Sequence, residues 1–439
     1  MRLIENIINK SRRRRHSPQG LKKKKLAIGA KFSQMGSRFK WVLILLALLL
    51  IGSVLLNFVL PFINNILLLD FKPDPSAEQR ITSLWNGNSR LIILTAGIDN
   101  HDGYKFVDLL SLIVIDPEQK YVGVFAINTD LNIFSQSAGK VVNIRTVYNL
   151  REAKGKEARV LIEAVENLLA VRIDRYLITD TTAFAELSGA LQPISLKLDS
   201  NVYDKDLAKR FDGVEGWKAG TTEVEAKLIP AFAAADVNGR NDQLNRQTAI
   251  IAEMIKSMDS FQNLLNFPAF FEKITANVRT DLTKKDAFFI AGALWGIRSD
   301  QFKSGYTKMS SMVKVSNFGV YGRYEPAFDG IDKDLASILY DFDIAREQSR
   351  VEVLNGSGVR GLATSRSRWI TNTGGRVVFF GNSLETEEKT KIFVSEPEKY
   401  PYTLKELERI FNGKVEYPGY DYVHKHIGEI VVVIGKEYQ

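Results

Sequence analysis

The stretch LIILTAGIDNHDGYKFVDLLSLIVIDPEQKYVGVFAINTD, residues 91–130, decides the fold of this chain. It contains three short apolar runs, at 91–96, 110–115 and 121–127, which are rich in β-branched residues and therefore predict strands. The polar segment DPEQK between the second and third runs predicts a turn, so these two strands should form a hairpin.

Strands and helices alternate in the sequence that follows. Apolar residues recur at helical spacing in three segments, 158–170, 182–191 and 247–255. Asn245 is placed to cap the last of these helices, and 176–179 predicts another strand. We therefore expect an α/β or α+β domain with a mixed sheet, which covers residues 90–347.

A second module of about 90 residues is expected at 350–438. It opens with VEVLNGSG, residues 351–358, a predicted strand that enters a glycine loop. The other predicted elements are helices at 362–371 and 404–411 and strands at 377–380, 391–394 and 430–434. Their order along the chain, strand–helix–strand–strand–helix–strand, indicates a small C-terminal α/β sandwich.

The glycine loop at 355–358 has two interpretations. Its backbone N–H groups could hold an anion at the start of the following helix, or it could be only the tight turn between strand and helix. It lacks the Gly-Lys-Ser/Thr of a P-loop and the glycine spacing of a dinucleotide-binding loop. Because such loops are more often turns, the tight turn is favoured.

The N-terminal residues differ from the rest of the chain in charge. Residues 1–40 contain 13 of the 59 Lys and Arg but only one of the 51 Asp and Glu, so they carry +12 and the remainder carries −4. We expect a disordered, basic cytoplasmic tail here. No nucleic-acid partner is expected, because the folded part of the chain is slightly acidic.

One transmembrane helix is predicted at 41–69, before a linker at 70–89. From Val42 to Leu60 the sequence has no charged residue, and at about 1.5 Å per residue this run approaches the ~30 Å hydrocarbon core of a bilayer. The basic residues before it should stay in the cytoplasm, so the C-terminal domains should be extracytoplasmic. A cleaved signal peptide is disfavoured, since the run is too long and no small-residue cleavage site follows.

The chain has no Cys and four His, which excludes disulfides, thiolate chemistry and cysteine zinc sites. His424 and His426 form an HKH segment without a third nearby ligand, so a surface pair is favoured over a metal site. His16 lies in the tail and His101 in a predicted loop. The motifs HExxH and GxSxG are absent from the sequence, which leaves zinc-protease and serine-hydrolase chemistry without support.

Three acidic residues lie at the ends of the first three predicted strands: Asp99, Asp108 and Asp130. Because neighbouring strand ends can converge, their carboxylates could share one pocket, and carboxylate oxygens suit Mg²⁺ or Mn²⁺. Acids at strand ends are also common as turn formers and caps. The residues alone leave both interpretations open.

These residues resemble the opening of the LytR-CpsA-Psr (LCP) family, in which a strand-Gly-x-Asp, a Ser-Asp before a strand and a closing Pro-Arg-Asp recur. Gly97 and Asp99 match the first element, Asp108 the second and Asp130 the third. Further matches are Asn143 and Tyr148 in VVNIRTVYN, and the pair Arg246-Gln247 at the start of the closing helix. Residues 351–363 and 431–438 independently resemble the LytR C-terminal module.

The resemblance implies an LCP-like domain and a LytR C-terminal-like domain behind one transmembrane helix. It implies a phosphotransferase that moves a glycopolymer from a polyprenyl-pyrophosphate carrier to a cell-wall acceptor, often peptidoglycan, outside the membrane. In this chain Asp99 and Asp108 would bind Mg²⁺ or Mn²⁺, and Asp130 would orient the site or act as the catalytic base. The phosphate-binding residues would be Arg246, Arg145, Arg240 and Gln247.

The chain departs from the family pattern at the arginines. Asn128 and Thr129 stand where the family has Pro-Arg, and Gln243 stands where a further arginine is usual. Ala234 and Asp236 align with an Arg-x-Arg. A single transition-state arginine contributes ~10³–10⁵-fold to phosphoryl transfer in GTPases, so the loss of up to four without replacement should abolish transfer.

Two hypotheses therefore remain. The chain is either a divergent transferase, in which Arg145, Arg240 and Arg246 replace the missing arginines, or a non-catalytic relative that binds a polyprenyl lipid or wall polymer as a scaffold. A transcriptional regulator ranks last, because the short basic tail offers no folded domain that could read DNA.

Overall fold

The computed structural model describes most of the chain after residue 84 and short helical pieces before it. The described residues are 46, 48–50, 52–53, 55–60, 63–64, 85–180, 183–184, 194–203, 216–235, 237–257, 278–295, 297–315, 323–416, 423 and 425–438. They fall into two compact units, 1–64 and 65–439, which are considered separately. The described pieces of the first unit include a π-helix, η1 (Leu55–Val59).

The predicted transmembrane helix at 41–69 is described only in these pieces. Among the residues that the structure covers, no helix combines the length and the apolar character needed to cross a bilayer. The predicted tail at 1–40 and residues 70–84 of the predicted linker lie outside the described residues. The tail, the span and the linker stay predictions.

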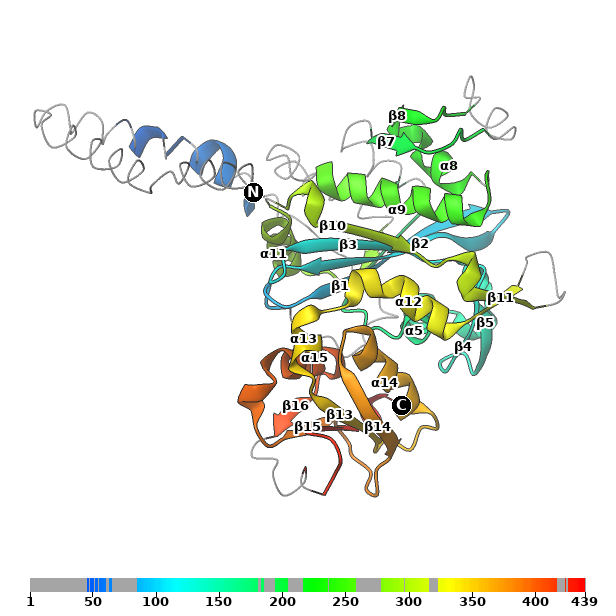
Figure 1. Cartoon of the computed structure of the whole chain (residues 1–439). Helices are drawn as coiled ribbons and strands as arrows, with labels where there is room; N and C mark the ends of the chain where they lie inside the picture. Colours follow the sequence, from blue (N-terminus) through cyan, green and yellow to red (C-terminus); the bar gives the residue numbers. More distant parts are fainter. Residues whose placement is uncertain are drawn as a thin grey trace, which may run out of the picture. The chain divides into compact units, whose positions relative to one another are not determined.

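A six-stranded mixed sheet forms the centre of the second unit (Figure 1). In order across the sheet, its strands are β10 (Phe302–Tyr306), β3 (Tyr121–Ala126), β2 (Tyr104–Asp116), β1 (Leu91–His101), β6 (Arg175–Asp180) and β9 (Val278–Thr280). The pairs β1–β2, β2–β3 and β6–β9 are antiparallel, whereas β1–β6 and β3–β10 are parallel. The predicted mixed sheet and the hairpin around DPEQK are confirmed.

Helices cover both faces of this sheet (Figure 1). On one face, α5 (Glu157–Leu169) and α12 (Phe328–Leu339) share a buried core with alternate residues of the central strands, such as Leu94 and Leu112. On the other face, α9 (Arg240–Ser257) and α11 (Lys284–Leu294) pack against the intervening residues, such as Ile93. The main domain is therefore a three-layer α/β/α structure.

The helix α9 corrects one prediction. It begins at Arg240, so Asn245 lies inside the helix and is not its N-cap. The buried face of its first two turns is mostly polar, with Gln243, Arg246 and Gln247 buried beside a single apolar residue, Leu244. The apolar periodicity therefore starts too late to mark the true beginning of the helix.

The hairpin of β1 and β2 is longer than the two apolar runs that predicted it. Asp102 and Gly103 form its two-residue turn, with φ values of 51° and 81°. This pair of left-handed conformations is typical of tight hairpins, and it keeps the strands paired through polar residues. Asp99, Asp108 and His101 consequently lie within the hairpin and not in loops.

A β-bulge interrupts the hairpin near its outer end. The register shifts between Gly97 and Ile98, and Asp108 is the extra residue that β2 contributes there. Because of this extra residue, Val107 and Leu110 both pack in the core on the α5 side of the sheet. The side chain of Asp108 is thereby directed to the α9 side.

Short ribbons and turns complete the main domain. Three are antiparallel ribbons: β4 (Asn132–Ser135) with β5 (Lys140–Asn143), β7 (Ile194–Leu198) with β8 (Gly220–Val224), and β11 (Met312–Val315) with β12 (Arg323–Pro326). The remaining helical elements are η3 (Ile144–Asn149), η4 (Arg151–Ala153), η5 (Ala226–Leu228), α8 (Ile229–Ala234), η7 (Ser299–Gln301), η8 (Met309–Ser311) and α13 (Phe342–Glu347). Of the helix predicted at 182–191, only 183–184 are described, and they are helical.

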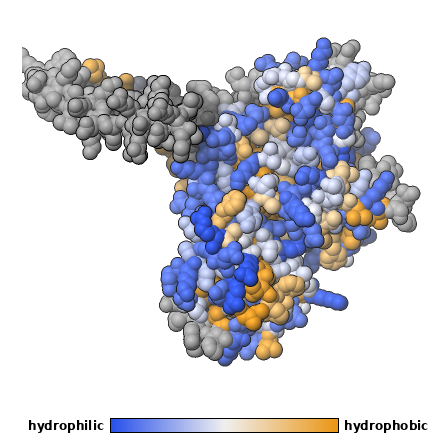
Figure 2. Space-filling view, in the orientation of Figure 1, coloured by the Kyte–Doolittle hydropathy of each residue, from blue (hydrophilic) through white to orange (hydrophobic). Residues whose placement is uncertain are grey.

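The C-terminal module is a second α/β layer structure. Its five-stranded sheet has the order β14 (Arg376–Asn382), β13 (Arg350–Asn355), β17 (Ile430–Ile434), β15 (Lys391–Val394) and β16 (Lys414–Glu416). The helices α14 (Leu362–Asn372) and α15 (Pro401–Phe411) pack with β13, β15 and β17 in one core. A short turn, η9 (Pro397–Lys399), precedes α15, and another, η10 (Lys436–Tyr438), follows β17. Figure 2 shows hydrophobic residues gathered on this module, where Phe379, Phe380 and Leu384 are exposed.

The glycine loop of this module is held by hydrogen bonds between its own residues. The Asn355 side-chain oxygen accepts hydrogen bonds from the backbone N–H and the hydroxyl of Ser357, at 3.1 and 2.7 Å. These bonds favour the tight-turn interpretation. His426 donates to or accepts from the buried Glu352 at 2.9 Å, while His424 lies outside the described residues.

The connection between α5 and β6 contacts the C-terminal module. Ala170 ends α5 in a left-handed conformation, and it packs in the core of the C-terminal module. Arg172 donates hydrogen bonds to the carbonyls of Arg409 and Ile410, at the end of α15, at 3.2 and 3.0 Å. A piece of the main domain thus completes the core of the second module.

Candidate active site

Three acids and two arginines meet at the outer end of the β1–β2 hairpin. Asp108 Oδ1 lies 2.8 Å from Arg145 Nη2, and Arg145 Nη1 lies 3.7 Å from Asp130 Oδ1. Arg240 Nη2 lies 3.4 Å from Asp130 Oδ2. Asp99 adds a third carboxylate, whose charge acts on Asp108. We call these five residues the acid–arginine cluster.

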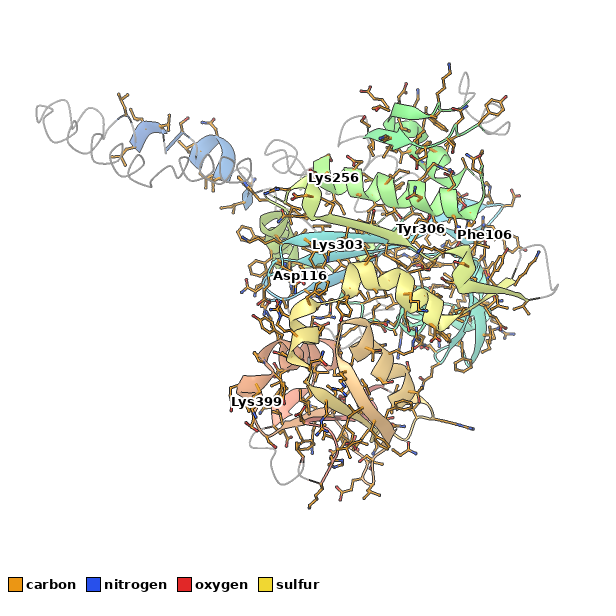
Figure 3. All side chains as sticks on the ribbon, viewed as in Figure 1. Phe106, Asp116, Lys256, Lys303, Tyr306 and Lys399 are labelled. Carbon is orange, nitrogen blue, oxygen red and sulfur yellow. The ribbon has the colours of Figure 1, made fainter. Side chains whose placement is uncertain are left out.

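The cluster combines segments that are far apart in sequence. Asp99 and Asp108 come from the hairpin, Asp130 follows β3, Arg145 belongs to η3, and Arg240 is the first residue of α9. Figure 3 labels Phe106 at the cluster end of β2 and Asp116 at the other end of this strand. The carboxylate side chains are 20–26% exposed, so solvent and ligands can reach them.

Two hydrogen bonds to backbone carbonyls fix the position of Asp130 and Arg145. The N–H of Arg145 donates to the carbonyl of Thr129 at 2.8 Å, and the side-chain amide of Asn143 donates to the carbonyl of Asp130 at 3.2 Å. The Arg145 guanidinium lies over the Phe106 ring, 5.9 Å from its centroid. The VVNIRTVYN segment therefore holds the loop of Asp130 in place.

Arg240 contacts two of the positions where the expected arginines are missing. Its guanidinium donates to Thr129 Oγ1 at 3.0 Å and to Gln243 Oε1 at 2.5 Å. It also donates to Asn128 Oδ1 at 3.2 Å. One arginine from the start of α9 thus lies beside both substituted positions.

Arg246 and Gln247 are buried next to the cluster and bond to protein atoms. The Arg246 guanidinium donates to the carbonyls of Phe232 and Ala235 and pairs with Asp242. Gln247 donates to the carbonyls of Ala233 and Asp108, at 3.2 and 3.3 Å. These bonds satisfy the carbonyls around the end of α8 and favour a positioning role for both residues over direct phosphate binding.

Of the other two aligned positions, only Ala234 is described. Its carbonyl accepts a hydrogen bond from the Gln243 side chain at 2.9 Å, and Asp236 lies outside the described residues.

Burial dominates the electrostatics of Asp108. Its partial burial raises the pKa of the carboxyl, Asp99 raises it further, and Arg145, Arg240 and His101 oppose the rise. His101 Nε2 lies 2.8 Å from Asp99 Oδ2, so this histidine covers part of Asp99. The two neighbouring carboxylates repel each other, and a cation between them would relieve this repulsion.

The donor set of Asp99 and Asp108 fits Mg²⁺, which commonly takes one or two protein carboxylates and completes its shell with water and phosphate oxygens. Among the residues that the structure describes, no group of three or more His, Asp or Glu is placed to hold a metal ion by itself. An ion at these two carboxylates would therefore depend on oxygens from water or from a substrate.

Sequence reasoning did not assign Phe106, Asn128 or His101 to the site. The Asp-Gly turn at 102–103, flanked by alternating side chains, is a hairpin signal that could have extended both strands and placed His101 beside Asp99. Asn128 could be recognised only as a departure from the family pattern, because its partner Arg240 is 112 residues away in sequence.

Comparison with known proteins matches two families along the chain. The LytR_cpsA_psr family matches residues 71–335, and a family described as LytR cell envelope-related transcriptional attenuator matches residues 348–438. The chain is 25% identical over 206 residues to the polyisoprenyl-teichoic acid–peptidoglycan teichoic acid transferase TagV of Bacillus subtilis, which is 46% of this chain and 49% of that protein. It is 25% identical over 224 residues to the corresponding transferase TagU of Bacillus licheniformis, 50% of this chain and 65% of that protein.

Both matches span less than two thirds of these relatives. Among solved structures, the crystal structure of Bacillus subtilis TagV is 22% identical, with a TM-score of 0.47 over 56% of this chain and 94% of that chain. TagT bound to LIIa-WTA is 16% identical, with a TM-score of 0.46 over 58% of this chain and 92% of that chain. The family match covers more than half of the 439 residues. This chain belongs to the LytR-CpsA-Psr family.

Proposed function

We propose that this chain is a membrane-anchored, extracytoplasmic transferase that moves a glycopolymer from a polyprenyl-pyrophosphate carrier onto peptidoglycan or another wall polymer. Family membership and the names of the relatives support a transferase of the cell wall. The observation that carries the proposal is the acid–arginine cluster, in which three carboxylates and two guanidinium groups share one accessible site. The predicted helix at 41–69 would keep this site near its lipid-borne substrate.

The chemistry is the attack of an acceptor hydroxyl on the phosphorus that carries the glycopolymer. A new O–P bond forms, the bond to the second phosphate breaks, and polyprenyl phosphate leaves. When bound to Asp99 and Asp108, Mg²⁺ or Mn²⁺ would neutralise charge on the phosphate oxygens. Asp130 accepts the proton of the attacking hydroxyl, because its carboxylate lies at the centre of the cluster.

Arg145 and Arg240 bind phosphate oxygens in this proposal. Both guanidinium groups already face Asp130, so an anion held by them would lie beside the base. Arg240 is the replacement for the arginines that the family has at the positions of Thr129 and Gln243, since its guanidinium contacts both side chains. Such charge neutralisation supplies most of the catalysis in phosphoryl transfer.

The experiment uses the full chain in proteoliposomes with a polyprenyl-pyrophosphate-linked oligosaccharide and a wall glycan acceptor, and it measures released polyprenyl phosphate. Asp108→Asn should reduce release by about 10³-fold or more, because it removes a metal-binding carboxylate. Asp300→Asn is the matched control, since Asp300 forms an exposed ion pair with Arg298. Unchanged release by the Asp108 variant would refute the assignment.

A second pair of variants tests the replacement arginine. Arg240→Gln should reduce release by about 10³-fold or more, in the range of transition-state arginines. The double variant Arg240→Gln, Thr129→Arg should release polyprenyl phosphate at least about tenfold faster than Arg240→Gln alone, because it returns a guanidinium to the family position. Full activity of Arg240→Gln would show that this arginine does not bind the reacting phosphate.

The second candidate function is a non-catalytic scaffold. Two observations favour it: the missing family arginines, and the engagement of Arg246 with backbone carbonyls and Asp242. Saturable binding of the lipid-linked oligosaccharide without any release of polyprenyl phosphate, with Mg²⁺ present, would establish this alternative.

A further inference from the structure

The helix α11 exposes large aromatic side chains on the face that points away from the core. Its buried face packs on the α9 side of the sheet, through residues such as Ile290 and Leu294 (Figure 1). On the outer face, the side chain of Phe288 is 49% exposed. Trp295, at the C-cap of the helix, continues this face and is 61% exposed.

The same face of the helix is basic. We define the α11 face by its exposed residues, Lys284, Lys285, Phe288, Gly292 and Trp295. At 3.6 residues per turn, these five positions fall within about one third of the helix circumference. Asp286, the one acid in the sequence of α11, is buried and pairs with Arg175, so it does not neutralise the α11 face. Lysines in a first turn oppose the helix dipole, so they do not serve to stabilise the helix itself.

The chain enters the main domain beside the α11 face. The ring centroids of Trp85 and Phe289 lie 5.9 Å apart in an edge-to-face contact, and those of Phe289 and Phe288 lie 6.1 Å apart. Fifteen residues, 70–84, separate Trp85 from the predicted transmembrane helix at 41–69. Since a fully extended chain of this length reaches about 50 Å, the α11 face is tethered within about that distance of the bilayer.

The composition of the α11 face matches the surface of an anionic bilayer. Tryptophan prefers the interface between water and hydrocarbon, and lysines are attracted to anionic lipid while their stems cover apolar surface. A helix that combines apolar residues with lysines is typical of proteins that lie in this interface. A protein partner fits less well, because Phe288 and Trp295 together bury at most about 500 Å², whereas a stable protein interface buries about 800 Å² per partner.

We propose that the α11 face docks on anionic lipid of the membrane in which the chain is anchored. Phe288 and Trp295 would enter the interface, and Lys284 and Lys285 would contact lipid phosphates. The inference rests on the proposed function for the membrane anchor at 41–69. Docking would restrict the orientation of the main domain over the bilayer, and thereby the direction from which a lipid-borne substrate approaches the acid–arginine cluster.

The test uses the absence of cysteine from the sequence. Gly292→Cys introduces a single thiol on the α11 face, at a position where a new Cβ would have no atom within 4 Å, and the thiol carries a nitrobenzoxadiazole label. With the full chain in phosphatidylglycerol proteoliposomes, lipids that carry a nitroxide near the headgroup should quench this label. Thr364→Cys is the matched control, because Thr364 is exposed on α14 in the C-terminal module, and its label should not be quenched.

Charge reversal on the α11 face should weaken docking. The double variant Lys284→Glu, Lys285→Glu should lower the ratio of quenched to unquenched label at position 292 about tenfold or more, since each basic residue near an anionic surface contributes about fivefold. Replacing phosphatidylglycerol with phosphatidylcholine should also lower this ratio. The control is Lys197→Glu, Lys218→Glu, which reverses two exposed lysines in and beside the β7–β8 ribbon and should leave the ratio unchanged.

Equal quenching at positions 292 and 364, or an unchanged ratio after reversal of Lys284 and Lys285, would overturn the proposal. Protection of the 292 label from aqueous iodide without quenching by the lipid nitroxide would assign the α11 face to a protein partner and overturn it as well. A chain that does not float with the liposomes after an alkaline wash would refute the anchor and, with it, this inference. The transferase function fails separately, in the assay of polyprenyl phosphate release.

Discussion

Replacing Arg90 with methionine should destabilise the chain more than any exposed arginine substitution. The Arg90 side chain is 3% exposed and bonds to Asp116 and Asp341, to the carbonyl of Leu339 at 3.2 Å, and lies 3.6 Å from Glu406. Burial disfavours its charge, yet these acids and a nearby tyrosine raise the pKa of Arg90 above its ordinary value. Methionine fills much of the same volume but leaves buried carboxylates without their cation.

Loss of one partner from a buried ion pair costs about 3–5 kcal/mol, and the number of carboxylates around Arg90 places this case toward the upper end. The comparison is Arg298→Met, which breaks an exposed pair with Asp300 and should cost below about 1 kcal/mol. The measurement is denaturant unfolding of the full chain in detergent, followed by tryptophan fluorescence, to which Trp369, buried in the C-terminal module, contributes. Equal losses of unfolding free energy for Arg90→Met and Arg298→Met would refute the argument that the buried ion pairs of Arg90 stabilise the chain.

Three further perturbations have expected outcomes. Burial disfavours the charge of Glu406, but Arg409 and Arg90 outweigh it and lower the pKa of this carboxyl to about 2. The stability that the carboxylate contributes should be complete above its ordinary pKa near 4.5 and lost as the pH falls from there to about 2. Glu406→Gln should therefore reduce the fall of the melting temperature between pH 4.5 and pH 2. Asp286→Asn should cost about 3 kcal/mol or more of unfolding free energy, because Asp286 pairs with the buried Arg175 at 2.8 Å; a loss below about 1 kcal/mol would contradict this. Gly123→Ala should cost about 1–3 kcal/mol, since the new Cβ would lie 2.5 Å from Ile338 Cγ2, and an unchanged unfolding midpoint would show that α12 can move aside.

Much of the fold followed from apolar periodicity. The strands at 391–394 and 430–434 have the predicted bounds. The helix α5 differs from the prediction by one residue at each end, and α14 by one residue at its C-terminal end. Periodicity failed where buried side chains are polar. The start of α9 was missed for this reason, and the polar outer half of the β1–β2 hairpin was taken for a loop.

The site could be predicted only in part from sequence. Asp99, Asp108 and Asp130 were candidates because acids at strand ends can converge, and Arg145 and Arg240 were candidates as basic residues near the matching motifs. Their meeting depends on a β-bulge and on contacts between residues more than a hundred positions apart, such as Arg240 with Thr129. Local patterns contain no information on such contacts, so sequence alone could not separate Arg240 from Arg246.

The contact of Ala170 with the C-terminal core has a practical consequence for shortened versions of this protein. A fragment that ends near residue 347 would keep Ala170 and Arg172 but would lose the surfaces that cover them. A fragment that begins near residue 348 would lack one residue of its own core. Each half, expressed alone, should therefore aggregate more readily than the whole chain. The two halves mixed together should recover solubility, because Ala170 and Arg172 can again pack against the C-terminal module.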